Sequence, residues 1–115
     1  MRLVERVEVI RKLEEWQAGK ASAKELWEWA LQIKEDGEPK DSVVQDVVDI
    51  LADLPMDLVI VDDAQVLIEA LQDNLDQVQL SQNLIWNYFD FLNTEPRKEA
   101  LIDDPFYGPF CAPTY

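Results

Sequence analysis

The segment DSVVQDVVDILADLP, residues 41–55, carries the clearest periodic pattern in the chain. At 100° per residue, the carboxylates Asp46, Asp49 and Asp53 fall within about 60° of one another on one side of a helix. The other side is apolar and consists of Val43, Val44, Val47, Ile50, Leu51 and Leu54. The segment therefore predicts a helix with one buried face and one acidic stripe that faces solvent.

Flanking residues mark where this helix begins and ends. Asp41 or Ser42 can cap its start, and Pro55 ends it within a residue or two. The next stretch, Leu58–Val61, is a short β-branched run that fits either a strand or an extended connector. We favour the connector.

Two further helices are predicted upstream. Over residues 3–17, apolar residues recur at helical intervals, and Gly19 stands where a helix commonly stops. Ser22 and Glu25 then form a capping-box pattern, and the second helix ends near Gly37. The expected inner faces are Leu3, Val7, Ile10 and Leu13 in the first helix and Leu26, Trp29, Ala30 and Ile33 in the second.

Two more helices and a short last one are predicted downstream. Asp62 or Asp63 caps a fourth helix, with an acid at the positive end of the helix dipole. After the polar link QDNLD, residues 78–93 form a fifth, aromatic helix, and Thr94 and Pro96 can open a short helix. The apolar face of the fourth helix is Val66, Leu67, Ala70 and Leu71.

These elements predict an all-α fold, a single-domain bundle of about five helices with antiparallel neighbours. At 115 residues the chain is long enough for one core and too short for two. Residues 1–102 form the expected helical domain, and residues 103–115 form an irregular aromatic tail that packs on it. Asp103 and Asp104 before Pro105 indicate a turn.

Composition bears on the compartment. No apolar run approaches the roughly 18 residues that span a bilayer, and the start of the chain interleaves charges where a signal peptide has an apolar core. The single cysteine, Cys111, cannot form an internal disulfide, which agrees with a reducing compartment. We expect a cytoplasmic protein that does not enter a membrane.

Charge is distributed unevenly along the chain, whose formal net charge is −14. Residues 1–34 hold seven Lys/Arg and six Asp/Glu, whereas residues 35–115 hold three and eighteen. Between Asp41 and Glu95 there is no basic residue. A field of this sign repels nucleic acid and anionic membrane and attracts basic proteins or divalent cations.

Catalytic equipment is scarce. The chain has no histidine, the commonest general base, and with three glycines it has no glycine-rich phosphate loop. A carboxylate with a tuned pKa needs partial burial, whereas the acids of residues 46–53 are interpreted as a solvated face. Asp62 and Asp63 could ligate a divalent cation, but the spacing and loop glycine of an EF-hand are missing, and capping is the preferred interpretation. We expect no enzyme activity, no cofactor and no metal.

The tryptophans divide into two groups. Trp16, Trp27 and Trp29 belong to the first two helices, where core packing is expected. In the fifth helix, Trp86 lies on the side of Gln79, Asn83 and Asp90, opposite the expected inner face of Leu80, Leu84, Tyr88 and Phe91. An aromatic residue on an acidic face is typical of a binding hot spot. The alternative is that Phe106, Tyr107 or Phe110 of the tail covers Trp86.

Several stretches carry a family resemblance: LEEWQAGKASAKELWEWA with its Trp-x-x-Gly turn, LVIVDDAQVLIEAL, TEPRKEAL and DDPFYGPF. On these the chain resembles a diffuse group of small acidic all-helical bacterial proteins that are uncharacterised or similar to immunity proteins. The resemblance implies a helical protein that blocks a toxin by masking it, and it assigns no individual residue.

The sequence thus favours a non-catalytic, acidic protein-binding module, an immunity protein for a basic toxin being one form of it. The expected binding residues are Asp46, Asp49, Asp53, Trp86 and Asp90. One alternative is a small helical domain whose acids serve only solubility. Another is a carboxylate site for a divalent metal that draws on Asp62 and Asp63. The partner and the oligomeric state stay open.

Overall fold

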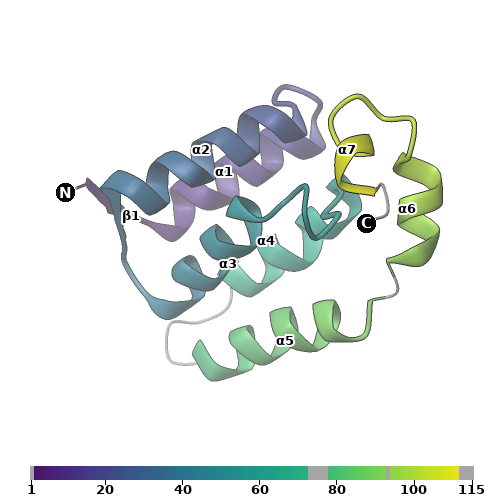
Figure 1. Ribbon diagram of the computed structural model, residues 1–115. Coiled ribbons are helices and arrows are strands. Elements are labelled where there is room, and N and C mark those ends of the chain that lie inside the picture. The colour runs from purple at the N-terminus through teal and green to yellow at the C-terminus, as the bar shows by residue number, and fades with distance from the viewer. Residues whose placement is uncertain (1, 73–77, 93, 112–115) are drawn as a thin grey trace.

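Helix α3 (Ser42–Ala52) lies at the centre of the computed structural model, which describes residues 2–72, 78–92 and 94–111 (Figure 1). The side chain of Asp41 caps it, accepting the backbone N–H of Val43 at 2.9 Å and of Val44 at 3.1 Å. The predicted apolar face is confirmed, and its buried residues are Val43, Val44, Val47, Val48, Ile50, Leu51 and Ala52. Helices α1, α2, α4 and α5 all pack against α3.

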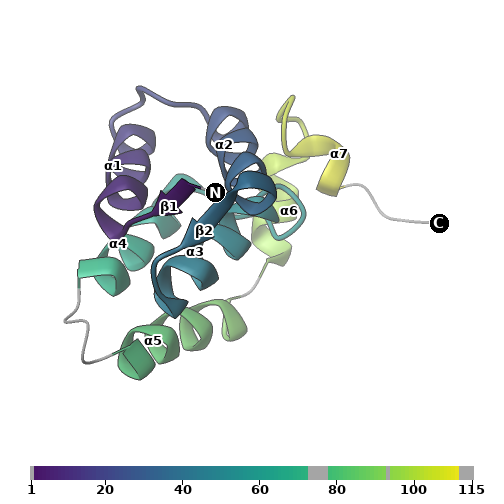
Figure 2. The same ribbon diagram turned by 90° about the vertical axis from the view of Figure 1, so that its left-hand side faces the viewer.

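The other elements form layers on either side of this helix. Figures 1 and 2 show α1 and α2 on one side of the layer that holds α3 and α4, α5 on the opposite side, and α6 and α7 at one end. In chain order they are β1 (Arg2–Val4), α1 (Arg6–Gln17), α2 (Ala23–Asp36), β2 (Gly37–Pro39), α3, the 3-10 turn η1 (Val61–Asp63), α4 (Ala64–Gln72), α5 (Val78–Asp90), α6 (Glu95–Leu101) and α7 (Gly108–Cys111).

A two-stranded parallel sheet corrects the all-α prediction. Strands β1 and β2 pair in the register Arg2↔Gly37 to Val4↔Pro39, so the fold is mostly helical with a very small sheet. Each strand has three residues, which is too short for a period-2 pattern to be visible in the sequence. Because this pairing takes residues 2–4, helix α1 begins at Arg6 and not at Leu3. Leu3 and Val7 are exposed, and the inner side of this segment is Val4, Val9, Leu13 and Trp16.

The predicted end of the first helix and both predicted ends of the second are confirmed. Helix α1 ends at Gln17, and Gly19 follows with a φ of 75°, a conformation that glycine adopts without strain. Ser22 and Glu25 form the capping box of α2, with both reciprocal bonds present. No residue of Leu58–Val61 lies in a strand: the run is the predicted connector, and its last residue opens η1.

Helix α5 is rotated relative to the prediction. It buries Ser81 and Ile85, whereas Leu80, Leu84 and Phe91 are exposed, Phe91 to 87%. Polar bonds fix this rotation, since side chains on its two flanks reach carboxylates of α3 and η1, as described below. The helix ends at Asp90, three residues before the predicted end. The predicted link QDNLD lies mostly outside the described residues.

Two aromatic residues of the C-terminal tail pack on α2, and a third bonds the connector after α3. Phe106 and Phe110 contact the ring of Trp27, with centroids 5.7 and 6.4 Å away. Tyr107 is buried and its hydroxyl donates to the carbonyl of Val59. Asp104 forms the predicted turn, accepting the N–H groups of two following residues at 2.8 and 3.0 Å. The tail contains the short helix α7 and is therefore less irregular than predicted.

Core packing of the tryptophans in the first two helices is confirmed. Trp16 is a member of the core, and Trp27 and Trp29 pack against it in half-buried positions. The indole N–H of Trp27 donates to the carbonyl of Ala52 at 2.7 Å, so this ring also fastens α2 to the end of α3.

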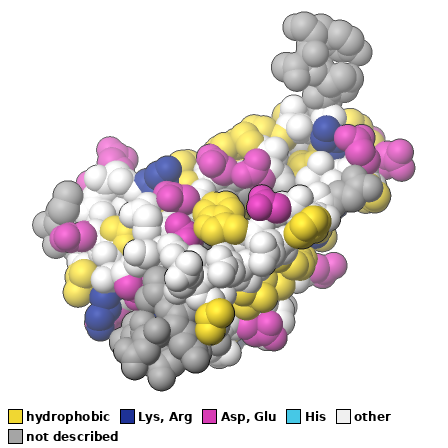
Figure 3. Space-filling model, turned by 90° about the horizontal axis from the view of Figure 1, so that it is seen from below, with side chains coloured by type: hydrophobic (Ala, Val, Ile, Leu, Met, Phe, Trp, Pro, Cys, Tyr) yellow, Lys and Arg dark blue, Asp and Glu magenta, His cyan; other side chains and the backbone are white. Residues whose placement is uncertain are grey.

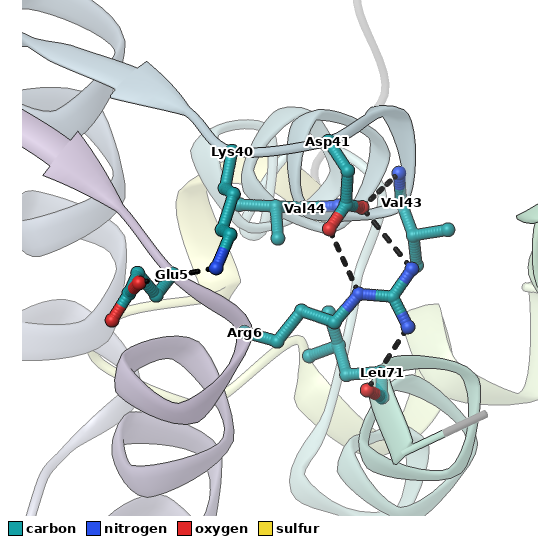
Figure 4. A network of polar contacts seen from close by, with 7 residues as sticks. All are labelled: Glu5, Arg6, Lys40, Asp41, Val43, Val44 and Leu71. Carbon is teal, nitrogen blue, oxygen red and sulfur yellow. Dashed lines mark hydrogen bonds and ion pairs between the residues drawn. The ribbon is translucent and has the colours of Figure 1, made fainter. Parts of the chain in front are cut away.

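A polar network ties the start of α1 to α3 and α4 (Figure 4). Arg6 Nε donates to Asp41 Oδ2 at 2.8 Å, and Arg6 NH1 donates to the carbonyl of Leu71 at 3.3 Å. Nearby, Lys40 Nζ lies 3.2 Å from Glu5 Oε1. Burial alone would raise the pKa of the Asp41 carboxyl, but the bonds from Arg6 and from two backbone N–H groups outweigh it and lower this pKa.

Asp41→Asn should lower the free energy of unfolding by about 1–2 kcal/mol near pH 7, because the cap and the charged bond to Arg6 both weaken. A carboxyl whose pKa is lower in the folded state stabilises above its unfolded pKa of about 4, and this is lost as pH falls through the folded pKa. Urea unfolding at a series of pH values would show the gap between wild type and variant closing in acid. The exposed Asp103→Asn is the control, and a gap that does not depend on pH would contradict the assignment.

Candidate functional site

Trp86 is an exposed aromatic residue that is held in place by hydrogen bonding. It lies on α5 with 41% of its surface exposed, and its indole N–H donates to Asp46 Oδ2 at 3.2 Å. Gln82 Nε2 donates to the same oxygen at 2.8 Å. Asp46 is therefore half-buried and joins α3 to α5, which corrects the prediction that it belongs to a fully solvated stripe. Phe106 and Phe110 lie against Trp27, and Tyr107 is buried with its hydroxyl on Val59, so the alternative in which one of these three covers Trp86 is wrong.

The other predicted binding residues lie at different places on this surface. Asp53 is exposed just after α3, and Asp90 is exposed one helical turn beyond Trp86 at the end of α5. Asp49 is half-buried on the opposite flank of α3, with one carboxylate oxygen 3.5 Å from Nζ of Lys34 on α2. The structure thus brings Asp46 and Trp86 into contact and places Asp49 beside a basic residue.

A groove of about 370 Å³ adjoins Trp86. It lies between the end of α3, the connector that follows, the end of α5 and the start of α6, and its lining includes Met56, Asp57, Trp86, Phe89, Leu92 and Lys98. Figure 3 shows the face of the molecule that carries α5, where hydrophobic and acidic side chains lie beside one another and basic side chains lie toward the edges of the view.

Asp57 is the site residue that the sequence analysis missed. Burial, and secondly the neighbouring charge of Asp53, raise the pKa of its carboxyl. Among the described residues its side chain makes no hydrogen bond or ion pair. The signal available in the sequence was an acid between Met56 and Leu58, directly after the helix-ending Pro55. We call Asp46, Asp53, Asp57, Trp86 and Asp90 the acidic face.

A buried ion pair fixes the walls of the groove. Asp63 is fully buried, and its carboxylate accepts Arg97 NH1 at 2.6 Å, Arg97 NH2 at 2.8 Å and the Tyr88 hydroxyl at 2.6 Å. Arg97 NH1 also donates to the carbonyl of Leu58 at 3.0 Å. The hydrogen bond to Asp63 raises the pKa of Arg97, and burial, followed by the bond to Asp63, raises the pKa of Tyr88. One carboxylate therefore connects the connector, α4, α5 and α6.

The same contacts decide between the two interpretations of Asp62 and Asp63. Asp63 accepts the backbone N–H of Ile60 at 3.0 Å, so it satisfies a free donor at the start of η1, the turn that leads into α4, whereas the prediction had an acid capping the fourth helix itself. Both of its oxygens are engaged by Arg97, while Asp62 is exposed, so the pair does not converge on one point as metal ligands must. Within the described part of the chain, no group of three or more acidic or cysteine side chains could hold a metal ion.

None of the helices among the described residues has the length and apolar character needed to cross a bilayer. No protein-family model, curated protein or solved structure matches the chain.

Arg97→Ala should cost about 3–5 kcal/mol of unfolding free energy, because it leaves the buried Asp63 charge without its partner. Adding Asp63→Asn removes that charge, so the double variant should lose less than the single one in urea unfolding. The adjacent Lys98→Ala is the matched control, since Lys98 is exposed and its ion pair with Glu95 has little weight. Additive losses for the two substitutions would show that the pair does not act as a unit.

Asp57→Asn should raise the melting temperature slightly at neutral pH, by the equivalent of at most about 0.5 kcal/mol. The reason is that a raised pKa means the folded state disfavours the ionised carboxylate, so the neutral amide relieves a cost. By the same sign, the contribution of Asp57 in the wild type improves as pH falls toward its folded pKa. Thermal melts with exposed Asp62→Asn as control check this, and a lower melting temperature would refute it.

Proposed function

We propose that the protein is a non-catalytic module that binds a basic partner protein through its acidic face. The observation that carries the proposal is Trp86, an exposed ring fixed by Asp46 and placed beside an apolar groove. Tryptophan is enriched at the centre of protein interfaces, where one aromatic anchor often supplies much of the binding free energy. Because Trp86 is already held in one position, little side-chain freedom is lost when a partner covers it.

Charge supports a basic partner. Asp57 lines the groove together with Trp86, its charge is reinforced by Asp53, and Asp90 is exposed one helical turn beyond Trp86 on α5. Lys98, the basic residue in the lining of the groove, is paired with Glu95 at 3.5 Å. Such a face steers a cationic protein toward it and raises the association rate, an effect that salt suppresses. A second copy of the chain is a poor partner, because each copy carries a net charge of −14.

The distribution of ion pairs speaks against solubility as the whole role of the acids. Cations from the first part of the chain meet the acids on the other side of α3, as in the pairs Arg6–Asp41 and Lys34–Asp49. The acidic face receives no such partner among the described residues. Acids that served only solubility would have no reason to gather around an exposed tryptophan.

The finer form of the proposal is immunity: masking of a basic toxin, for example a nuclease whose cationic substrate-binding surface matches an acidic face. The test is co-expression in the native host or a surrogate. A toxic partner that binds the protein should be neutralised by the wild type and not by Trp86→Ala, whereas a non-toxic partner would reject immunity and leave partner binding in place.

Affinity capture from the native host, followed by calorimetric titration of the purified partner, tests the binding proposal. Trp86→Ala should weaken binding by about 30-fold or more, the loss typical of a hot spot of about 2 kcal/mol. Asp53→Asn should mainly slow association, and raised salt should weaken wild-type binding.

Two substitutions serve as matched controls. Phe91→Ala removes an aromatic residue that is more exposed than Trp86 but follows the end of α5 and lies outside the groove lining, and Glu14→Gln removes an exposed acid on α1. Both should bind like the wild type. A partner without a basic surface, or binding that ignores both salt and Trp86→Ala, would contradict the proposal.

A further inference from the structure

The groove beside Trp86 combines three properties that one side chain can match. Its walls include the apolar residues Met56, Phe89 and Leu92, an exposed indole forms part of the lining, and Asp57 supplies a carboxylate. Its volume of about 370 Å³ is at the small end of the roughly 300–1,000 Å³ range of ligand pockets, which suits one or two side chains.

We propose that this groove is a guanidinium site that receives an arginine side chain of the basic partner. The inference rests on the proposed function and names the group that the partner inserts. The apolar stem of the arginine lies along the walls, its planar head stacks on the indole of Trp86, and its N–H groups bond the carboxylate of Asp57.

The setting of Trp86 favours a cation over its ring. Its indole N–H donates to the carboxylate of Asp46, which fixes the ring and polarises it toward greater electron density. A cation on an aromatic face gains about 0.5–1 kcal/mol when exposed and about 2 when desolvated, with tryptophan the strongest acceptor. The groove provides the partial desolvation.

The charged groups around the groove leave a negative balance. Asp57 and Lys98 both line the groove, the charge of Asp53 acts on Asp57, and Lys98 Nζ lies 3.5 Å from Glu95 Oε1. A purely apolar insert would cover Asp57 without giving it a hydrogen bond, which is unfavourable. A guanidinium satisfies Asp57, and its delocalised charge tolerates the nearby Lys98 better than a compact ammonium does.

The test is an NMR titration of the full chain with three small probes: N-acetyl-arginine methylamide, its neutral isostere N-acetyl-citrulline methylamide, and N-acetyl-lysine methylamide. Arginine should produce saturable shifts at the Trp86 indole N–H and at the amides of residues 56–59. Citrulline should bind at least about tenfold more weakly, because it lacks the charge, and lysine should lie between them.

Variants locate the site. Trp86→Ala should abolish the saturable shifts, and Asp57→Asn should weaken arginine binding severalfold, whereas Phe91→Ala and Asp62→Asn, both exposed and outside the groove lining, should leave it unchanged. Because Asp57→Asn is expected to stabilise the fold, a loss of arginine binding in that variant cannot be attributed to unfolding.

The outcomes separate this inference from the proposed function. Equal binding of citrulline or of lysine, or shifts spread over the acids without saturation, would overturn the guanidinium site. If the basic partner binds through Trp86 while arginine leaves the groove unchanged, the groove inference fails and the proposed function stands. If arginine binds but no basic partner exists, the assignment of the arginine to a partner protein is overturned.

Discussion

A fully buried carboxylate cannot remain ionised without partners, and in this protein that constraint acts at Asp63. Its partners come from far along the chain, since Arg97 is 34 residues away and Tyr88 is 25 residues away. Removing two charges from water costs several kcal/mol per ion, and only their mutual attraction offsets this desolvation cost. The geometry of the pair must therefore be close to ideal for the buried pair to be stable. Helices α5 and α6 therefore have little freedom in where they meet the connector and α4. The groove lies where these elements come together, so its shape follows from the same requirement.

The opposite treatment of acids on α3 explains the uneven charge of the sequence. Asp41 and Asp49 meet cations from the first part of the chain, and their charges help to hold the helices together. On the α5 side, Asp46 is satisfied by the neutral donors Gln82 and Trp86, so its negative charge is not cancelled. A neutral donor satisfies the hydrogen bonding of the carboxylate and leaves its negative charge in place, whereas a cationic donor would satisfy the hydrogen bonding and also cancel the charge. The absence of basic residues between Asp41 and Glu95 thus produces a structured surface that stays negative.

Local sequence signals predicted the ends of the helices well and the packing of the helices on one another poorly. A helix end depends on residues only a few positions away, so it can be read from the sequence. The structure has helix ends at the predicted signals, which are Gly19, the Ser22 capping box, the Asp41 cap and Pro55. The two strands were not predicted, because a segment of three residues is too short to show an alternating pattern. The predicted inner face of α5 was wrong, because the apolar residues Leu80, Leu84 and Phe91 outweighed Ser81 in the pattern. The actual rotation of the helix depends on hydrogen bonds from Tyr88 and Trp86 to carboxylates far away in the sequence.

For the candidate site too, local features could be predicted from the sequence and features that depend on tertiary structure could not. Periodicity placed Trp86 away from the apolar stripe of its helix, and the structure leaves it exposed. The sequence could not assign a role to Asp57, because its importance arises from the connector, α5 and α6 meeting around it. It also treated Asp63 as an ordinary capping acid, since nothing local distinguishes it from Asp62, yet one is fully buried and the other exposed.

The contrast between Asp63 and Asp57 gives a physical reason to look for binding at the groove. Among the described residues, no buried side-chain polar atom lacks a hydrogen-bond partner, so the interior meets its polar requirements. Asp57 is exposed and, within the part of the chain that the structure describes, its side chain has no hydrogen-bond or ion-pair partner. Partial desolvation and the charge of Asp53 raise the pKa of its carboxyl, so the folded chain disfavours the ionised form. Folding alone would be served better by an amide at this position. Residues that destabilise the fold in this way are commonest at binding sites, because a bound partner can supply the missing interaction. A cation that enters the groove would remove the cost at Asp57 as it gains the face of Trp86, so both contributions favour the bound state.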